Sequence, residues 1–197
     1  MKAREKLEHR VRTQIVNELA HHQVLVLYAD GLYRHWRCQR PGDSCFWFDV
    51  VTWPGNLLYT GDMGEYLFKR TDDMVKFMRR SCMSYSYAAE KCCASGRIGV
   101  EEWSYELLDE ELSDVLAENP EHADEAQEIR DAYSTYEAPH DAQRAMHESS
   151  IWDGGDMPSC EIFTFHFLWC LHALKWFCER VDDVTATIPQ PKENASV

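Results

Sequence analysis

Five histidine and aspartate residues of this sequence could support acid–base chemistry. They are His35, Asp49, Asp62, His166 and His172. The aspartates interrupt a strand-like apolar stretch and the last two histidines lie in an apolar C-terminal stretch, where an ionisable group needs a partner. Such pairs have the shifted pKa values that general acid–base catalysis uses. We interpret the set as a buried structural polar site and assign no catalytic residue. The alternative is a small hydrolase or nucleotide-modifying enzyme that uses His35, Asp49 and Asp62.

The eight cysteines offer a second kind of chemistry. His35, Cys38 and Cys45 lie close together in sequence and could form an activated thiol or a zinc site. Zinc sites usually contain closely spaced cysteine pairs, and the sequence has no Cys-x-x-Cys motif. No apolar leader follows the charged start of the chain, so free thiols in a reducing compartment are expected. The sequence therefore predicts no metal, no cofactor and no disulfide framework.

The charge of the chain is distributed unevenly. The net charge is −14, yet residues 1–100 carry 15 Lys and Arg against 11 Asp and Glu, while residues 101–161 carry 2 against 19. Dense carboxylates on helices can imitate the phosphates of nucleic acid and compete for a basic groove, although many acidic helices are simply solvated. We predict that this region binds a protein. The expected contact residues are Glu102, Glu106, Asp109, Glu110, Asp114 and Glu118.

The basic residues of the first hundred positions support a further alternative, which is direct binding of nucleic acid through the sheet half. Lysine and arginine neutralise phosphates, and exposed aromatic side chains can stack on bases. The residues concerned are Arg34, Arg37, Arg40, Lys69, Arg70, Lys76, Arg79 and Arg80. The acidic region would repel nucleic acid, so we place this alternative below protein binding.

Alternating apolar residues and turn signals predict an antiparallel β-meander over about residues 24–70. The turn signals lie at residues 29–31, 40–43, 53–56 and 61–64. Three to five strands are expected. Trp36, Trp47 and Trp53 are predicted to share one packed aromatic face of this sheet.

Helical regions are expected before and after the meander. An amphipathic helix is predicted over residues 2–22, and a second helix from residue 71, where Thr-Asp-Asp is a good N-terminal cap, to Cys92 or Cys93. Residues 100–150 are predicted to form an acidic helical lobe. Residues 161–181 are apolar on nearly every side, which is typical of a helix in the centre of a domain.

These elements predict an α+β fold: an antiparallel β-meander covered by helices, with an acidic helical lobe. One domain is expected over residues 1–188, followed by a disordered tail at 189–197. The most apolar run, residues 162–178, contains two histidines and a lysine (His166, His172 and Lys175) and is short for a bilayer span. We therefore predict a cytoplasmic protein without a membrane partner.

One segment of the meander carries the motifs of a known group of proteins. It contains the patterns DGLYRH, FDxVTWPG and GDMGxYxFxRxxDMxxFxR. These motifs resemble a widespread family of phage and prophage proteins to which no reaction is assigned, and the resemblance extends over most of the chain. It implies a phage accessory protein, a class in which small non-enzymatic inhibitors of host defence, such as anti-CRISPR proteins, are common. The expected partner is a host protein or ribonucleoprotein complex with a basic groove, in the bacterial cytoplasm.

Overall fold

A computed structural model describes residues 1–133, 138–152 and 157–182 of the chain. Its contacts divide the chain into two compact units. We call Met1–Glu8 together with Glu101–Phe163 the acidic unit, and His9–Val100 together with the described part of Thr164–Val197 the sheet unit. The expectation of one domain over residues 1–188 stays a prediction. The tail predicted at 189–197 lies outside the described residues.

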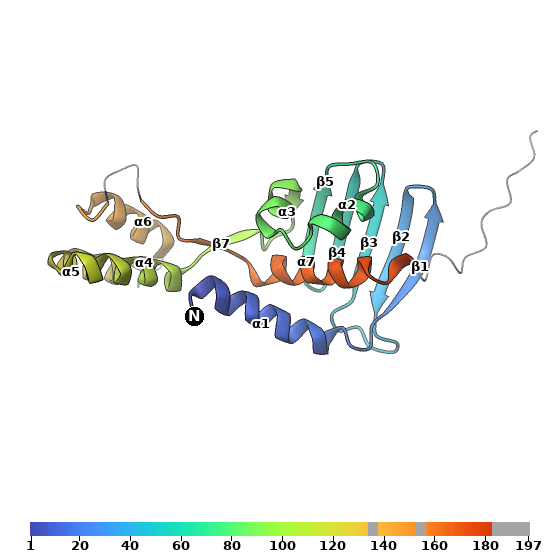
Figure 1. The fold of residues 1–197 in the computed structure, drawn as a ribbon, viewed down its shortest axis with the longest axis horizontal. Coiled ribbons are helices and arrows are strands. Elements are labelled where there is room, and N and C mark those ends of the chain that lie inside the picture. Colours follow the sequence, from blue (N-terminus) through green and yellow to red (C-terminus); the bar gives the residue numbers. More distant parts are fainter. Residues whose placement is uncertain (134–137, 153–156, 183–197) are drawn as a thin grey trace, which may run out of the picture. The chain divides into compact units, whose positions relative to one another are not determined.

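The sheet unit is built on six antiparallel strands that neighbour one another in sequence order (Figure 1). They are β1 (Gln23–Asp30), β2 (Tyr33–Gln39), β3 (Phe48–Trp53), β4 (Asn56–Gly61), β5 (Gly64–Lys69) and β6 (Cys92–Ser95). The α+β class and the antiparallel meander are therefore confirmed. The sheet has more strands than the three to five that were predicted.

The pleat of the strands puts alternate residues on one buried face. Trp36 lies opposite Val50, and Val50 lies opposite Tyr59; each of the three is at most 1% exposed. Gly61 at the end of β4 has no room for a side chain, because a Cβ atom there would come within 2.3 Å of the Trp47 carbonyl oxygen. The apolar alternation of the sequence thus defines the inner face of the sheet.

The three tryptophans of the meander do not share this face, so that prediction was wrong. Trp36 is buried, whereas Trp53 follows the buried Thr52 in β3 and therefore points to the opposite face. Trp47 precedes β3 and lies against Arg37, whose carbon Cζ is 4.8 Å from the ring centroid. A shift of one residue along a strand moves every side chain to the opposite face of the sheet. The turn lengths alone did not determine which residues face inward.

The helix predicted from residue 71 to Cys92 or Cys93 is interrupted after Ser81, and its predicted end is wrong. The Asp73 carboxylate caps α2 (Met74–Ser81) by accepting hydrogen bonds from two backbone N–H groups, and a separate helix, α3 (Tyr85–Lys91), follows. Residues Cys92–Ser95 then pair with β5 as β6. This pairing satisfies backbone groups of β5 that would otherwise lie at a free edge, which is a non-local gain that helical periodicity does not reveal.

The C-terminal helix α7 (Phe165–Cys178) packs on the inner face of the sheet. Nine of its 14 residues are buried. Phe177 meets Trp36 with ring centroids 5.2 Å apart, and Phe167 meets Tyr66 at 5.3 Å. The apolar sequence predicted this central position, although residues 161–163 belong to a strand and not to the helix. Among the described residues, no helix is both long and apolar enough to span a bilayer.

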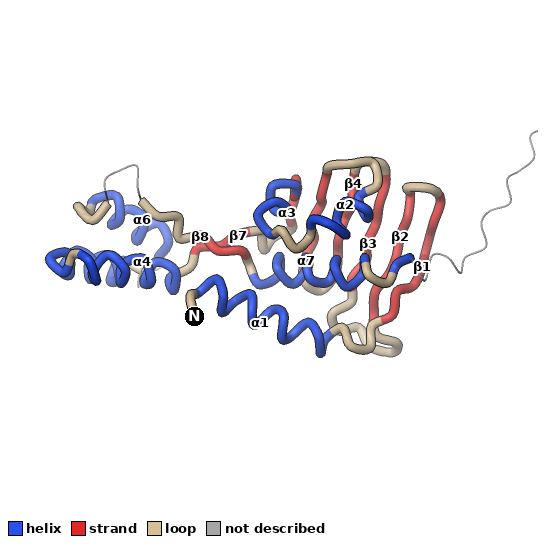
Figure 2. The backbone as a smooth tube through the Cα atoms, in the orientation of Figure 1, coloured by secondary structure: helices blue, strands red, loops and turns tan. Residues whose placement is uncertain are grey.

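The acidic unit has its own secondary structure (Figure 2). It also has its own hydrophobic core. Its elements are the start of α1 (Ala3–Glu18), β7 (Glu101–Trp103), α4 (Tyr105–Glu118), a 3-10 helix (Pro120–His122), α5 (Ala123–Ala132), α6 (Ala138–Glu148) and β8 (Glu161–Phe163). Leu108 and Leu112 of α4 pack with Ile129 of α5 and Met146 of α6, and none is more than 1% exposed. These helices occupy the region in which the acidic lobe was expected.

Candidate functional site

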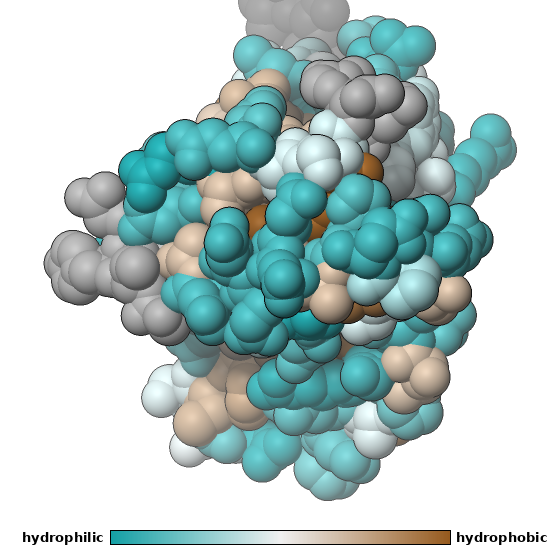
Figure 3. Space-filling view, turned by 90° about the vertical axis from the view of Figure 1, so that its left-hand side faces the viewer, coloured by the Kyte–Doolittle hydropathy of each residue, from teal (hydrophilic) through white to brown (hydrophobic). Residues whose placement is uncertain are grey.

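Five of the six predicted protein-binding acids lie on α4, and Glu102 lies on β7. Glu106, Glu110, Asp114 and Glu118 follow one another at intervals of four residues, so they lie along one side of the helix. Glu102, Glu106, Asp114 and Glu118 are exposed, whereas Asp109 and Glu110 are half-buried. Figure 3 shows the face of the molecule that includes this unit, and hydrophilic residues cover most of it.

Three of these six acids already have partners within the acidic unit. Asp109 accepts a hydrogen bond from Arg130 at 2.7 Å, and Glu110 accepts one from the Ala3 backbone N–H at 2.7 Å. Asp114 forms an ion pair with Lys2 at 3.3 Å. The remaining three, Glu102, Glu106 and Glu118, have no hydrogen bond or ion pair with a described side chain or backbone group. These three are the acids that are available to a partner.

The sequence reasoning missed further exposed acids of the same unit. Within Glu101–Phe163 they are Glu101, Glu121, Asp124, Glu128, Asp131, Glu148 and Glu161. The segment Glu101–Phe163 contains only two arginines, and both are held in ion pairs, Arg130 with Asp109 at 2.7 Å and Arg144 with Asp141 at 2.8 Å. The excess of negative charge over this segment is therefore not neutralised by its own bases. The density of acidic residues in this part of the sequence was the signal that could have identified the additional acids.

The predicted polar site is assembled only in part. His35 and Asp49 are joined by a hydrogen bond of 2.8 Å between Nε2 and Oδ2, and Arg37 donates to both Asp49 oxygens at 2.8 and 2.9 Å. Burial raises the pKa of Asp49, but the hydrogen bonds from Arg37 and His35 outweigh it and hold that pKa below its ordinary value. The register of β2 and β3 places Arg37 directly opposite Asp49. In the cluster of His35, Arg37 and Asp49, both carboxylate oxygens therefore have hydrogen-bond partners, as expected for a structural ion pair.

The other three residues of the predicted site lie elsewhere. Asp62 is exposed in the turn between β4 and β5 and is not a buried partner, because its backbone leaves the strand at Gly61. His166 is half-buried on α7 beside Phe165. His172, also on α7, shares a hydrogen bond of 2.9 Å with the Tyr85 hydroxyl. Asp62 therefore does not join the hydrogen-bonded pair of His35 and Asp49, and the triad that the enzyme hypothesis requires is not assembled.

Most of the basic residues proposed for nucleic-acid binding are engaged with acids of the sheet unit. The pairs are Arg34 with Asp73, Arg37 with Asp49, Arg40 with Asp43, Lys76 with Asp73 and Arg79 with Asp182. Three of the eight, Lys69, Arg70 and Arg80, have no ion pair with a described residue. Basic side chains that already form ion pairs contribute little to phosphate binding. We therefore rank direct binding of nucleic acid below protein binding.

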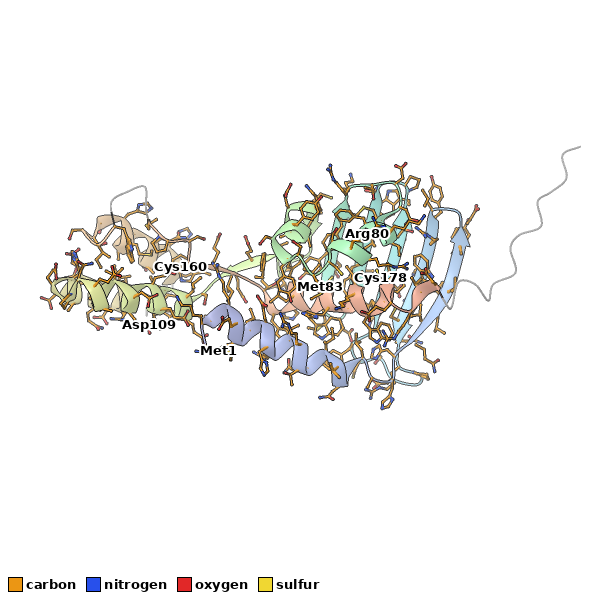
Figure 4. All side chains as sticks on the ribbon, viewed as in Figure 1. Met1, Arg80, Met83, Asp109, Cys160 and Cys178 are labelled. Atoms are coloured by element: carbon orange, nitrogen blue, oxygen red, sulfur yellow. The ribbon has the colours of Figure 1, made fainter. Side chains whose placement is uncertain are left out.

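A groove in the sheet unit was not predicted from sequence. It has a volume of about 610 Å³ and runs between the second half of α1 and the end of α7. Its walls include Arg12, Ile15, Val16, Leu19, Lys175 and Trp176. Met83, labelled in Figure 4, contributes to the wall from the connection between α2 and α3. The two main walls come from residues 12–22 and from residues 172–180, so no sequence motif brings them together.

Two histidines line this groove and both favour the neutral form. Burial lowers the pKa of His172 to about 4, and the neighbouring charges of Arg12 and Lys175 lower it further. Burial also lowers the pKa of His22, which is 8% exposed and whose Nε2 lies 3.0 Å from the Phe46 carbonyl oxygen. The groove is therefore positive because of its lysine and arginine side chains and not because of its histidines.

A metal centre has no visible basis in the described ranges. They contain no group of three or more His, Cys, Asp or Glu side chains that could hold a metal ion. All eight cysteines are free thiols, and burial raises the pKa of Cys38, Cys170 and Cys178, which keeps these thiols protonated.

Comparisons of the chain with protein-family models, with curated proteins and with solved structures give no match.

Proposed function

We propose that this protein is a non-enzymatic interaction protein whose acidic unit binds a basic surface of a partner. One observation carries the proposal. The segment Glu101–Phe163 has 19 acidic and 2 basic residues, and both basic residues are already paired inside the unit. A surface of one charge sign attracts a partner of the opposite sign and accelerates their association.

The helices of the acidic unit hold their carboxylates at defined spacings. Neighbours four positions apart on α4, such as Glu106 and Glu110, have Cβ atoms about 6 Å apart. The core of Leu108, Leu112 and Ile129 fixes α4 against α5, so the charges do not have to be ordered when the partner binds. Ordered negative groups of this kind can occupy a groove that normally accepts phosphates.

The partner class that we propose is a host protein or ribonucleoprotein complex that handles nucleic acid. The charge of the acidic unit supports a basic groove on the partner, and the motif resemblance to phage proteins supports a bacterial host and an inhibitory role in its cytoplasm. Because like charges repel, the acidic unit itself is not expected to bind nucleic acid.

Capture from a bacterial lysate with competition by nucleic acid tests this proposal. The protein is immobilised, and bound proteins are eluted first with excess duplex DNA and then with high salt. We expect the captured proteins to be released by DNA, since DNA and the acidic unit would compete for one groove. A mobility-shift assay with the protein alone should show no binding to the same duplex. Capture of nothing above the blank resin, or of proteins that DNA does not displace, would contradict the proposal.

A further inference from the structure

The groove between α1 and α7 has the size and the chemical character of a small-molecule site. Its volume of about 610 Å³ lies within the range of roughly 300–1,000 Å³ that is common for such sites. Ile15 of α1 and Leu19, which follows α1, are buried, whereas Val16 of α1 is 70% exposed. The groove therefore offers an open apolar wall to a ligand.

The charges in the groove are predominantly positive. Arg12, Lys175 and Arg180 line it, and Glu179 is the single acidic residue among its lining side chains. Glu179 is paired with Arg180 at 3.5 Å. Lys175 is exposed and has no ion pair with a described residue, and it lies close enough to His172 to disfavour protonation of the imidazole. An anionic group of a ligand would therefore find its counter-ion at Lys175.

The aromatic side chain of the groove is not arranged as a stacking platform. The Arg180 guanidinium lies over the Trp176 ring, 4.6 Å from the ring centroid, and also donates to the Trp176 carbonyl oxygen at 3.0 Å. The His22 ring meets the indole edge-on, with an interplanar angle of 85°. With these neighbours in place, the indole contributes apolar contact more readily than it stacks on a nucleobase.

From this combination we propose that the groove binds a small amphipathic carboxylate, a molecule with one carboxylate head and an apolar chain. The head pairs with the Lys175 ammonium, near Arg12 and the neutral His172. The chain lies along Val16 and the apolar residues of α1. This site is independent of the acidic unit and of its proposed partner, because every residue that forms it belongs to the sheet unit.

Three ligands separate the contributions of the head and the chain. Decanoate carries both, decanol carries the chain with a neutral head, and acetate carries the head alone. We expect isothermal titration calorimetry to show saturable binding of decanoate and no binding of acetate at the same concentrations. Decanol should bind at least about tenfold more weakly than decanoate, because its neutral head cannot form an ion pair with the Lys175 ammonium. Equal affinity for decanoate and decanol would overturn the role of the charge.

Variants of the groove locate the site. Lys175→Gln should weaken decanoate binding about tenfold and leave decanol binding unchanged within about twofold. The matched control is Lys69→Gln, which removes an exposed lysine outside the groove. Because Lys175 is exposed, its replacement should preserve the circular dichroism spectrum. An equal response of both variants to decanoate would place the binding elsewhere and overturn the proposal.

Nuclear magnetic resonance of the unmodified protein gives a test that does not depend on any variant. On addition of decanoate, the His172 ring proton signals and the Trp176 indole N–H signal should shift together and saturate. Decyl phosphate measured in parallel should bind no more tightly than decanoate. Tenfold tighter binding of the phosphate would overturn the assignment of a carboxylate, and the absence of any shift at these two residues would overturn the site.

Discussion

In the sheet unit, the carboxylates of Asp49 and Asp73 each accept a hydrogen bond of 2.8 Å from an arginine. In the acidic unit, Glu102, Glu106 and Glu118 have no such partner among the described residues. The first arrangement holds ionised groups that burial would otherwise destabilise. The second leaves charge free for an external partner, because exposed carboxylates are well solvated and need no internal counter-ion.

The hydrophobic cores of the two units also differ. In the sheet unit, aromatic side chains of α7 pack on aromatic residues of β2, β3 and β5, as in the pairs Phe177–Trp36 and Phe167–Tyr66. The core of the acidic unit consists mainly of aliphatic residues and alanines, such as Leu112 and Ala126. We infer that the sheet unit provides most of the stability and that the acidic unit mainly presents charge.

Removal of a large aromatic side chain from α7 should have the largest effect. Phe177→Ala is expected to lower the free energy of unfolding by about 3–5 kcal/mol, because the side chain is fully buried and its removal leaves a cavity. Urea denaturation measures the change. Met146→Ala, in the core of the acidic unit, is the comparison and should cost less. A larger cost for Met146→Ala would break the distinction between the two cores.

Acidification should destabilise the sheet unit through His172. The pKa of this histidine is about 4 in the folded protein against an ordinary value of 6.5. The unfolded chain therefore binds the proton more readily, and the free energy of unfolding should fall by up to about 3 kcal/mol as the pH falls from 6.5 to 4 and then level off. Denaturation at pH values across this interval measures it. His172→Gln should remove this part of the pH dependence, and an unchanged dependence would contradict the assignment.

Disruption of the Asp49 ion pair should have an intermediate effect. Arg37→Met is expected to cost about 1–2 kcal/mol at neutral pH, less than for a fully buried pair, because the Arg37 side chain is 39% exposed. The pKa of Asp49 is lowered in the folded protein, so its stabilising contribution is present above the ordinary value of 3.8 and is lost as the pH falls below it. Arg70→Met, an exposed arginine without an ion pair to a described residue, should change stability by less than about 0.5 kcal/mol.

Charge reversal in the acidic unit should have the smallest effect on stability. The triple variant Glu102→Lys, Glu106→Lys and Glu118→Lys is expected to change the free energy of unfolding by less than about 0.5 kcal/mol per site, since none of these acids has an internal partner to lose. Thermal unfolding followed by circular dichroism measures this. A cost of several kcal/mol would show that these carboxylates serve the fold and are not free for a partner.

Local patterns predicted the parts of the fold that local chemistry controls. Alternating apolar residues and turn signals predicted the antiparallel meander, and the apolar sequence around Trp169 predicted a central helix. The β6 strand was missed because Cys92–Ser95 gain their hydrogen bonds from β5, more than twenty residues earlier in the chain. The register of β2 and β3 that pairs Arg37 with Asp49 could not be predicted, because a shift of one residue would place a different residue opposite Asp49.

The candidate sites were predictable to different degrees. The excess of acids after residue 100 is visible in composition, so the acidic unit could be predicted, whereas the pairing of Glu110 with the Ala3 N–H could not, because it joins distant segments. His172 was identified as a buried polar residue, but its partner Tyr85 lies 87 positions away. The groove between α1 and α7 is likewise a product of tertiary packing.

The central claim is that the free carboxylates of the acidic unit form the partner-binding surface. The most direct test is quantitative capture from bacterial lysate by two variants that change the net charge equally. One carries Glu102→Lys, Glu106→Lys and Glu118→Lys in the acidic unit, and the other carries Asp30→Lys, Asp62→Lys and Asp72→Lys, three exposed acids of the sheet unit. We predict that the first variant loses at least about 90% of the captured partner, since three reversed charges each cost roughly 1 kcal/mol or more, and that the second retains most of it. Equal loss in both variants, or retention in the first, would contradict the claim.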